Sequence, residues 1–526
     1  MSRIDVAVVG AGPVGLSATI DLARRGVSVM VIDKHAEPAL HPKSRAVNVR
    51  TMEIFRSWGI EERVRAAGLA TPPVRYLGKD AASPWSDVVE SSVVADGGEN
   101  DLSPLPLEVF LCSQDILEPV LREAALQPPV DVRLSTEVLS VIEIEDGVRL
   151  ELRSRLDGST ETVEAAYVIG ADGAQSGIRE QLGIERDGEP SLQQSVSVLF
   201  RSDLITSRTD SESAFIYIDN PDTVGTVVFV PVDTEGRVAM LGRPPVLDRL
   251  PVDQVDWQEQ VRLAAGDPDL DVEIIDYRTW EVGAWVASDY QKGRIFLAGD
   301  ATHVMPPYGG FNQNAGIQDV HNLTWKLAAV LRGWATPALL GTYGPERRPV
   351  ALFDREEAVL NFRSHVGAEH DGPRTFRTEN FHHLGLDIGY RYDQGAVVLE
   401  PDQPRGPWPV STYTPSAAPG ERAPHVWLDE ARTTSTLDVL GSGVTVFAAI
   451  GARAAGEAVR AAADHGVPAT SVDLAPGALA TYGIDADGAV LVRPDGHVLA
   501  RVTDDAPTTV AKALAAITGA PVVQPA

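Results

Sequence analysis

The chain has 526 residues, of which 44% are hydrophobic and 6% aromatic, so it can form three or four units of roughly 150 residues each. Its 74 acidic and 45 basic residues give a net charge of −29. This charge argues against nucleic-acid and anionic-membrane partners, which require a concentrated basic face. The single cysteine, Cys112, excludes an intrachain disulfide, a CxxC redox pair and a thiolate metal cluster. We therefore expect an acidic cytoplasmic protein with no nucleic-acid, membrane or metal partner.

The first thirty-three residues have the pattern of a βαβ unit. The β-branched apolar run 4–9 predicts a strand buried on both faces, followed by a GxGxxG motif, a helix over 16–25 and a second strand over 27–32 that ends at Asp33. Such glycines let the backbone approach a pyrophosphate, while the aspartate accepts hydrogen bonds from a ribose 2′-hydroxyl and would repel a 2′-phosphate. The unit predicts a site for FAD or NAD. The residues expected there are Gly10, Gly12, Pro13, Val14, Gly15, Asp33 and Lys34.

Two further turns carry an aspartate beside a glycine directly after a predicted strand. Asp172-Gly173 follows the strand 167–170, and Gly299-Asp300 follows the strand 294–298. A carboxylate at such a turn can hold a ribityl hydroxyl where a neighbour bulkier than glycine would not fit. Each turn alone is an ordinary connection, but together with the GxGxxG motif, in this order, they favour FAD.

The composition changes twice along the rest of the chain. From about 193 to 285 strand patterns dominate, most clearly at 215–218 and 226–230, which predicts a sheet-forming lobe inserted into the first domain. Pro, Gly and Ser accumulate over 393–421 and indicate a linker. The remainder, 423–526, predicts a small α/β unit that contains a β-hairpin.

These motifs resemble those of the class A flavoprotein monooxygenases, the aromatic hydroxylases related to p-hydroxybenzoate hydroxylase. The resemblance covers most of the chain and rests also on Ser44-Arg45-Ala46 with Arg50-Thr51-Met52-Glu53, on Gln114 with Glu118, and on the stretch 316–327. It implies an α/β fold: a Rossmann-like FAD-binding domain, an inserted β-sheet substrate domain and a C-terminal thioredoxin-like domain. The further residues that it places at FAD are Arg45, Gln114, Val138, Asp172, Gly299, Asp300, Pro306, Gly310, Gln313 and Asn314.

The resemblance also implies a division of the chain into domains. It assigns 1–75, 104–190 and 286–392 to the FAD-binding domain, 76–103 and 191–285 to the substrate-binding sheet domain, 393–422 to a linker and 423–526 to the thioredoxin-like domain. Because Cys112 lies far upstream, the last domain has no redox cysteines. We expect it to be structural or to form an oligomer contact in a monomer or homodimer.

The implied activity is hydroxylation of an aromatic substrate, an aromatic polyketide or a substituted phenol, by way of a flavin C4a-hydroperoxide. It consumes O2 and a transient reductant, NADPH or NADH, for which the chain has no second nucleotide fingerprint. A long amphipathic helix from 314 to 332 is expected to aim its N-terminus, with its partial positive charge, at the reduced flavin. Two alternatives stay open: a Baeyer–Villiger or oxidative-rearrangement monooxygenase, and a non-catalytic FAD- or substrate-binding partner protein.

No catalytic base is assigned from the sequence. Tyr217 and Phe229 in the inserted sheet and Tyr308 in the loop before the long helix are candidate substrate contacts, and sheet core is an equally good interpretation of the first two. His303 can titrate near neutrality, but loop packing is the favoured role. The family has a second glycine where Asn312-Gln313 stand, and we expect the turn to survive because asparagine tolerates left-handed backbone.

Overall fold

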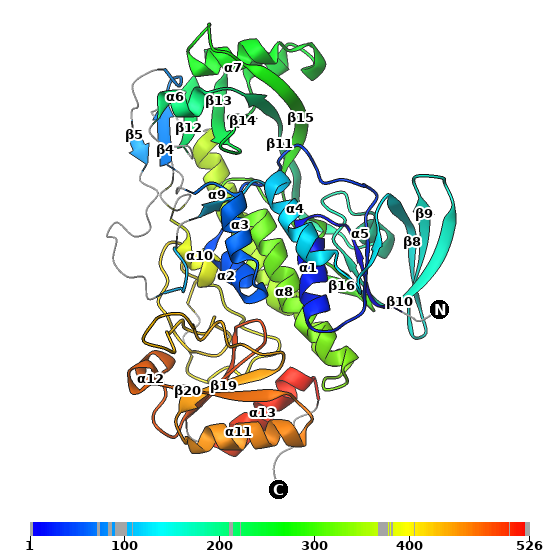
Figure 1. Cartoon of the computed structure of the whole chain (residues 1–526), viewed down its shortest axis with the longest axis vertical. Helices are drawn as coiled ribbons and strands as arrows, with labels where there is room; N and C mark the ends of the chain where they lie inside the picture. Colours follow the sequence, from blue (N-terminus) through cyan, green and yellow to red (C-terminus); the bar gives the residue numbers. More distant parts are fainter. Residues whose placement is uncertain are drawn as a thin grey trace.

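The computed structural model describes residues 4–70, 74–82, 87–89, 102–107, 109–209, 214–220, 222–366, 377, 379, 382–403, 406–503 and 505–520. Most of the predicted segment 76–103 and the last six residues of the predicted thioredoxin-like unit lie outside this description. The described residues form three large sheets that follow one another along the long axis of the molecule (Figure 1).

The first sheet is built around the predicted βαβ unit. Its central strand β1 pairs in parallel with β2 and with β10, so its apolar side chains are covered on both faces. Helix α1 (Pro13–Arg24) begins at a proline, which suits the first turn of a helix because the missing amide would have no partner there. The strands of this sheet are β1 (Ile4–Val9), β2 (Val29–Ile32), β7 (Asp131–Arg133), β8 (Thr136–Ile144), β9 (Gly147–Ser154), β10 (Thr160–Gly170), β16 (Gln291–Lys292) and β17 (Ile295–Leu297).

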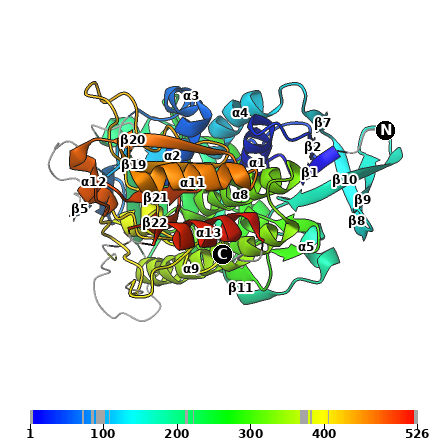
Figure 2. The ribbon, with the colours of Figure 1, turned by 90° about the horizontal axis from the view of Figure 1, so that it is seen from below.

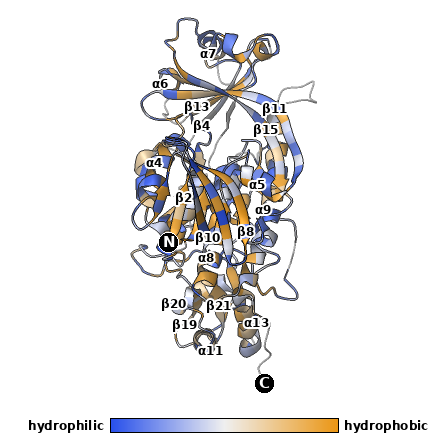
Figure 3. Cartoon of the chain, turned by 90° about the vertical axis from the view of Figure 1, so that its right-hand side faces the viewer, coloured by the Kyte–Doolittle hydropathy of each residue, from blue (hydrophilic) through white to orange (hydrophobic). Residues whose placement is uncertain are grey.

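The second sheet has the order β18-β15-β11-β14-β13-β12-β4-β5 and includes the strands predicted at 215–218 and 226–230. Its long strands β11 and β15 pair antiparallel and extend from this sheet towards the first one (Figure 3). Helices α6 (Leu204–Arg208) and α7 (Trp257–Ala265) contribute to the apolar cluster on one face of the sheet. The strands are β4 (Val74–Gly78), β5 (Asp87–Val89), β11 (Arg186–Arg201), β12 (Ala214–Asn220), β13 (Gly225–Pro231), β14 (Arg237–Gly242), β15 (Glu273–Ala287) and β18 (His303–Val304).

The third sheet has the order β20-β19-β21-β22, with a parallel β19–β20 pair and an antiparallel β21–β22 hairpin at the predicted place. This order, with its flanking helices, is that of a thioredoxin-like domain. Figure 2 shows α11 and α13 side by side when the molecule is seen from below. The elements are β19 (Val444–Ala449), α11 (Arg453–Asp464), β20 (Ala469–Leu474), α12 (Pro476–Tyr482), β21 (Ala489–Val492), β22 (Val498–Val502) and α13 (Ala506–Thr518).

Helix α8 (Phe311–Leu331) runs through the middle of the molecule (Figure 1). The sequence predicts an amphipathic helix, but its residues 313–329 are all buried. That expectation is wrong because the helix has neighbours on every side. Within the described part of the chain, no helix has the length and apolarity needed to cross a membrane. The remaining elements are β3 (Ala46–Val47), α2 (Val49–Trp58), α3 (Glu61–Ala67), β6 (Phe110–Leu111), α4 (Gln114–Ala125), α5 (Gly177–Leu182), α9 (Tyr343–Val366), α10 (Leu384–Ile388) and 3-10 helices at Pro245–Asp248, Val252–Gln254, Gly299–Ala301 and Pro337–Thr342.

Candidate functional site

The carboxyl ends of β1 and β10 meet at one edge of the first sheet, where open parallel sheets bind their ligands. Gly10 has φ +106°, and a Cβ on it would lie 2.2 Å from the Ala171 carbonyl oxygen. A Cβ on Gly15 would lie 1.8 Å from the Gly10 oxygen. Only glycine therefore fits at these two positions. At Gly12, by contrast, a Cβ would meet no protein atom within 4 Å, so this side of the loop faces open space.

The GxGxxG motif and the Gly299-Asp300 turn pack against each other at Val14. A Cβ on Gly299 would lie 2.8 Å from Val14 Cγ2, and one on Gly316 would lie 2.6 Å from the same atom. The absence of side chains at these glycines lets the start of α1 pack directly on the Gly299-Asp300 turn and on α8. The motifs therefore form one continuous surface, although they lie about three hundred residues apart in the sequence.

Asp33 occupies the predicted end of β2 and orders the glycine loop. Its Oδ2 accepts a hydrogen bond from the Ala11 amide at 2.6 Å, and its Oδ1 accepts one from the His35 amide at 2.7 Å. Each oxygen retains a second lone pair for a hydroxyl group. Lys34 beside it is exposed, and Val138, predicted at the adenine end, lies on the neighbouring strand β8 among the residues packed on this sheet.

The two predicted aspartates line the same cleft in different ways. Asp172 Oδ2 accepts from the Ile178 amide at 3.1 Å and its Oδ1 is buried with no partner among the described residues, while burial raises the pKa of this carboxyl. The Asp300 side chain is exposed to solvent, yet desolvation by the protein atoms around it raises the pKa of its carboxyl. Solvent contact together with desolvation indicates a carboxyl in the wall of a concave cleft.

A second group of predicted FAD contacts lies in residues 44–48 and the first turn of α8, which are hydrogen-bonded to each other. Arg45 is buried, its Nε has no partner within the described chain, and burial lowers its pKa to about 10 although Asp115 partly offsets this. Gln313 is buried, and both polar atoms of its side chain lack a partner in the same part of the structure. Gln114 lies next to this segment, with its backbone N–H donating to the backbone carbonyl oxygen of Ser44 at 2.8 Å.

Asn314 uses its side chain to hold these two segments together. Its Oδ1 accepts from the Asn48 amide at 3.0 Å, and its Nδ2 donates to the carbonyl oxygens of Ala46 and Gly310 at 3.0 and 2.7 Å. The side chain predicted to contact FAD is thus occupied by protein backbone. Gly310 precedes the helix in left-handed conformation with no side-chain cap, which leaves amides of the first turn free, and Pro306 is buried just before it.

Asn312 and Gln313 lie inside α8 rather than in a turn. The left-handed residues are Gly309 and Gly310, with φ of +113° and +72°, so neither Asn312 nor Gln313 adopts left-handed backbone. The Asn312 side chain bonds to the backbone of Met305 in both directions, at 2.9 and 2.8 Å. It therefore fixes the loop instead of entering a cleft.

These observations test whether a flavin dinucleotide fits. The cleft contains a glycine loop with open space at Gly12, an exposed carboxyl at Asp300 and unpartnered buried polar atoms on Arg45, Asp172 and Gln313. Buried polar groups are normally hydrogen-bonded, so the residues present fit a ligand rich in phosphate, hydroxyl and ring amide groups. The fold and this cleft define a Rossmann-like flavoprotein that carries an inserted sheet and a thioredoxin-like domain.

Comparison with known proteins identifies the family. Residues 3–353 match the model of an FAD binding domain, and residues 416–521 match that of the C-terminal part of aromatic-ring hydroxylases. The chain is 36% identical to 4-methyl-5-nitrocatechol 5-monooxygenase from a Burkholderia species, over 95% of this chain and 94% of that protein. It is 34% identical to the aklavinone 12-hydroxylase DnrF of Streptomyces peucetius, over 85% of this chain and 91% of that protein.

Solved structures agree with these relatives. The flavin-dependent monooxygenase PieE, in complex with FAD and substrate, superposes with a TM-score of 0.90 at 30% identity, over 99% of both chains. The ternary complex of aklavinone-11 hydroxylase with FAD and aklavinone gives 0.85 at 32% identity, over 98% of this chain and 99% of that chain. The chain belongs to the class A flavoprotein monooxygenases and is an FAD-dependent aromatic monooxygenase.

The three candidate substrate contacts lie in different surroundings. Phe229 is fully buried in the cluster shared with α6 and α7, where its ring packs edge-on against Phe200 at 5.9 Å. Its side chain lies on the α7 face of the sheet, so Phe229 has the surroundings of the sheet-core interpretation. Tyr217 alternates with Ile216 and Ile218 of that cluster and so lies on the opposite face. Tyr308 is partly exposed beside the α8 N-terminus, with its ring 5.7 Å from that of Phe362.

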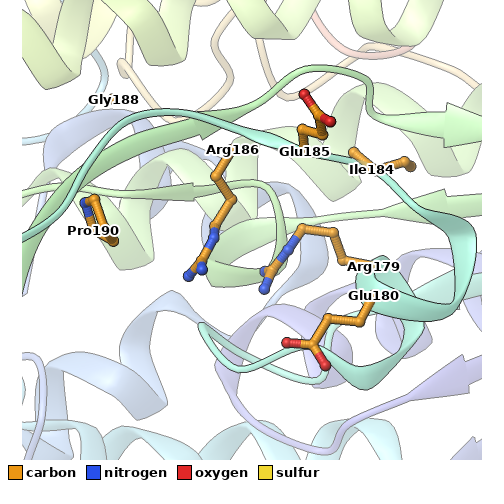
Figure 4. A pocket seen from close by; sticks show the side chains of 7 residues that line it. All are labelled: Arg179, Glu180, Ile184, Glu185, Arg186, Gly188 and Pro190. Carbon is orange, nitrogen blue, oxygen red and sulfur yellow. The ribbon is translucent and has the colours of Figure 1, made fainter.

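Figure 4 shows a pocket of about 410 Å³ between α5 and the start of β11. The guanidinium groups of Arg179 and Arg186 both point into it, 4.9 and 5.3 Å from the centre of the Trp285 ring. Arg179 Nη1 donates to the carbonyl oxygen of Ala301 at 3.3 Å, so the pocket adjoins the Gly299-Asp300 turn. The lining residues are Arg179, Glu180, Ile184, Glu185, Arg186, Gly188 and Pro190.

A buried cluster behind α8 was not predicted as part of the site. Asp319 lies 2.8 Å from His303 Nε2 and accepts hydrogen bonds from Arg347 Nε at 2.8 Å and from the Gly299 amide at 3.2 Å. All three side chains are fully buried. His303 thus has the packing role that we favour. Asp319 belongs to the stretch 316–327 that resembles the family, so the sequence contains a signal for its importance. Arg347 lies outside every motif, and the sequence contains no such signal for it.

Asp354, near this cluster, predicts a pH dependence of stability. Burial raises the pKa of its carboxyl from 3.8 to about 7, with Arg347 and His303 opposing the shift. Between pH 3.8 and about pH 7 the folded state therefore binds more protons than the unfolded state. The free energy of unfolding consequently falls as the pH rises through this range. We expect Asp354→Asn to gain about 3 kcal/mol in unfolding free energy, relative to wild type, between pH 5 and pH 8.

Denaturant unfolding at the two pH values measures this gain. The exposed Asp248, whose side chain is 61% accessible and pairs with Arg243, provides the control variant Asp248→Asn. Its difference from wild type is expected to be the same at both pH values. A pH-independent difference for Asp354→Asn would show that the buried carboxyl does not titrate in this window.

Proposed function

We propose that this monooxygenase hydroxylates an aromatic polyketide or a substituted phenol with electrons from NADPH or NADH. The observation that carries the proposal is that Arg45 Nε, Asp172 Oδ1 and both polar atoms of the Gln313 side chain are buried without a partner among the described residues, while Gly12 borders open space. Support for the substrate class comes from relatives that are named for aklavinone and for a methylnitrocatechol. A cytoplasmic location, where nicotinamide reductants are supplied, and a monomeric or homodimeric state belong to the proposal.

The proposed roles follow from the positions around the cleft. The glycine loop from Gly10 to Gly15 would hold the pyrophosphate, and Asp33, Lys34 and Val138 would surround the adenosine end. Asp172 and the Gly299-Asp300 turn would hold the ribityl chain. Bound FAD supplies the electron transfer and the oxygen activation. Around its ring we place Arg45, Gln114, Pro306, Gly310, Gln313, and Asn314 through the backbone that it fixes. The domain boundaries given from the sequence are part of this proposal.

The protein's own contribution to the reaction is orientation and charge. The uncapped first turn of α8 presents amides and a partial positive charge towards the cleft, which stabilises an anionic ring. Tyr217 and Tyr308 would contact the substrate between the inserted sheet and the cleft. The fully buried surroundings of α8 exclude water from this side.

The purified holoprotein provides the test. It is expected to be yellow, and a screen of phenolic and quinoid polyketides is expected to yield compounds that stimulate NAD(P)H oxidation and gain the mass of one oxygen atom. The connectivity of the product separates ring hydroxylation from the Baeyer–Villiger alternative, in which oxygen enters beside a carbonyl. Flavin that is bound and reducible, with no substrate-stimulated oxidation across the screen, would favour a non-catalytic binding partner.

The pocket in Figure 4 is where we place the anionic part of NAD(P)H. Two guanidinium groups match phosphate oxygens, and the pocket is also lined by the carboxylates of Glu180 and Glu185, which can accept hydrogen bonds from ribose hydroxyls. We expect Arg186→Gln to raise the KM for NAD(P)H about 10-fold, or about 1.4 kcal/mol, with kcat unchanged. Steady-state kinetics with saturating substrate measures this, and Arg453→Gln, an exposed arginine on α11, is the control.

A further measurement separates reductant binding from chemistry. Enzyme reduced with dithionite should convert substrate on mixing with O2 at the wild-type rate in Arg186→Gln, since that step needs no nicotinamide. An unchanged KM for NAD(P)H in this variant would place the reductant elsewhere.

A further inference from the structure

Helix α8 belongs to two cores. Ile317, Val320 and Leu323 pack in the core of the first sheet. Trp325 and Ala329, two and six residues beyond Leu323, are part of the cluster that contains β19, β22 and α13 of the thioredoxin-like domain. A helix of 21 residues is a rod of about 30 Å, so its first turn at the flavin cleft and its last turns in the other domain are rigidly connected.

The turn of the β21–β22 hairpin connects the thioredoxin-like domain to this helix through buried hydrogen bonds and ion pairs. Arg493 and Asp495 in this turn are at most 1% exposed. Arg493 Nη1 and Nη2 donate to the two carboxylate oxygens of Glu346 at 3.0 and 2.7 Å, and its Nε donates to Asp495 Oδ1 at 3.1 Å. Glu346 also accepts hydrogen bonds from Lys326 at 2.8 Å and Asn322 at 2.6 Å, which are both residues of α8.

A second branch of the same network reaches α2. Arg50 in α2 donates to the backbone oxygen of Asp495 at 2.6 Å and to Glu53 at 3.0 Å. Glu53 also pairs with Arg422, which lies just before the thioredoxin-like domain. Two residues before Arg50, at the start of α2, the Asn48 amide donates to Asn314. The turn also contacts α8 directly, since Asn322 Nδ2 donates to Asp495 Oδ2 at 3.3 Å, whereas Glu346 belongs to α9. The buried turn thus contacts α2 and α8, the two elements that carry residues of the proposed flavin site.

The charges in this network are balanced by one another. Burial alone would raise the pKa of Glu346, but Arg493 and Lys326 outweigh it and hold the pKa at about 2. Buried ion pairs contribute little net stability, since desolvation offsets their attraction, but they restrict the geometry of the groups that they join. The domain has no cysteine with which to perform redox chemistry. We therefore look for a role of the buried turn in fixing geometry.

We propose that the turn 493–497 fixes α2 and α8 in the arrangement that binds the flavin, with Arg493 and Asp495 as positioning residues. The inference rests on the proposed placement of FAD between residues 45–48 and the first turn of α8. It assigns the thioredoxin-like domain a task in the reaction of the first domain. In this proposal the two residues act through α2 and α8 and not by contact with cofactor or substrate.

The test compares two variants of the full-length protein. Arg493→Leu leaves Asp495 without its guanidinium partner, whereas the double variant Arg493→Leu and Asp495→Leu removes both charges and retains the Lys326–Glu346 pair. We expect both to bind FAD at least 10-fold more weakly than wild type in titrations of the apoprotein, and the bound flavin to show a shifted midpoint potential. The double variant is expected to unfold at nearly the wild-type denaturant concentration, because it has no unpaired buried charge.

The outcomes separate positioning from stability. A double variant with wild-type FAD affinity and midpoint potential would overturn the proposal, because the turn would then serve stability alone. Arg453→Leu, on the exposed face of α11 of the same domain, is the control and should leave both readouts unchanged. If Asp300→Ala also leaves FAD affinity unchanged, the placement of the flavin itself is wrong. If Asp300→Ala weakens FAD binding and the double variant does not, only the role of the turn is wrong.

Discussion

Replacing Asp319 by alanine is expected to destabilise the folded protein by about 3–5 kcal/mol and to remove its FAD. The carboxylate is fully buried and pairs with the fully buried Arg347. Burial alone would raise its pKa, but His303 and Arg347 outweigh burial and lower it, so the group is ionised in the folded state. Without it the guanidinium is an uncompensated buried charge, and the Gly299 amide loses its acceptor at the turn that carries Asp300.

Two measurements check this prediction: the flavin content of the purified variant, and its free energy of unfolding in denaturant. The matched control is Asp248→Ala, which removes an ion pair of similar length, 2.6 Å to Arg243, from the surface. Exposed pairs contribute at most about 1 kcal/mol, so this control should retain both FAD and stability. Wild-type stability of Asp319→Ala would show that the cluster behind α8 does not support the Gly299-Asp300 turn.

The parts of the site that the sequence predicts are those encoded over short distances. The β-branched run 4–9, the glycines after it and Asp33 at the end of the next strand specify a βαβ unit within thirty-three residues. The glycines at 10 and 15 are required by contacts with backbone atoms, which no other residue tolerates. Such local constraints leave a pattern in the sequence, and resemblance to the family then connects the distant turns.

The parts that were missed depend on which faces meet. Alternation in β12 and β13 shows that Ile216 and Phe229 are core-like, but it does not tell which face of the sheet turns to α7. The register of the pairing decides this, and it places Phe229 on the face that carries α7. In the same way, Glu346 and Arg493 are charged residue types that usually lie at the surface, and the family motif that contains Arg50 does not tell what its side chain contacts. Only the topology that brings three distant segments together makes them a buried network.

Replacing Gly12 by alanine is expected to abolish FAD binding in a protein that still folds. Gly12 has φ −78° and ψ −178°, which any residue adopts, and an added Cβ meets no protein atom within 4 Å. The apoprotein should therefore unfold within about 1 kcal/mol of wild type, as surface substitutions do. With the pyrophosphate on the glycine loop, however, the Cβ occupies the space in which the backbone approaches the phosphates. We expect FAD affinity to fall at least about 100-fold, or about 2.7 kcal/mol.

Gly15→Ala is the matched comparison, because it adds the same methyl group to the same loop. There the Cβ would lie 1.8 Å from the Gly10 oxygen, so the fold itself has to shift and both stability and FAD binding should be lost. Titration of each apoprotein with FAD and denaturant unfolding of each give the two quantities independently. Tight FAD binding by Gly12→Ala would mean that the phosphates do not lie against this loop, and that the open space at Gly12 belongs to solvent. Loss of affinity without loss of stability identifies that space as the part of the cleft filled by the cofactor.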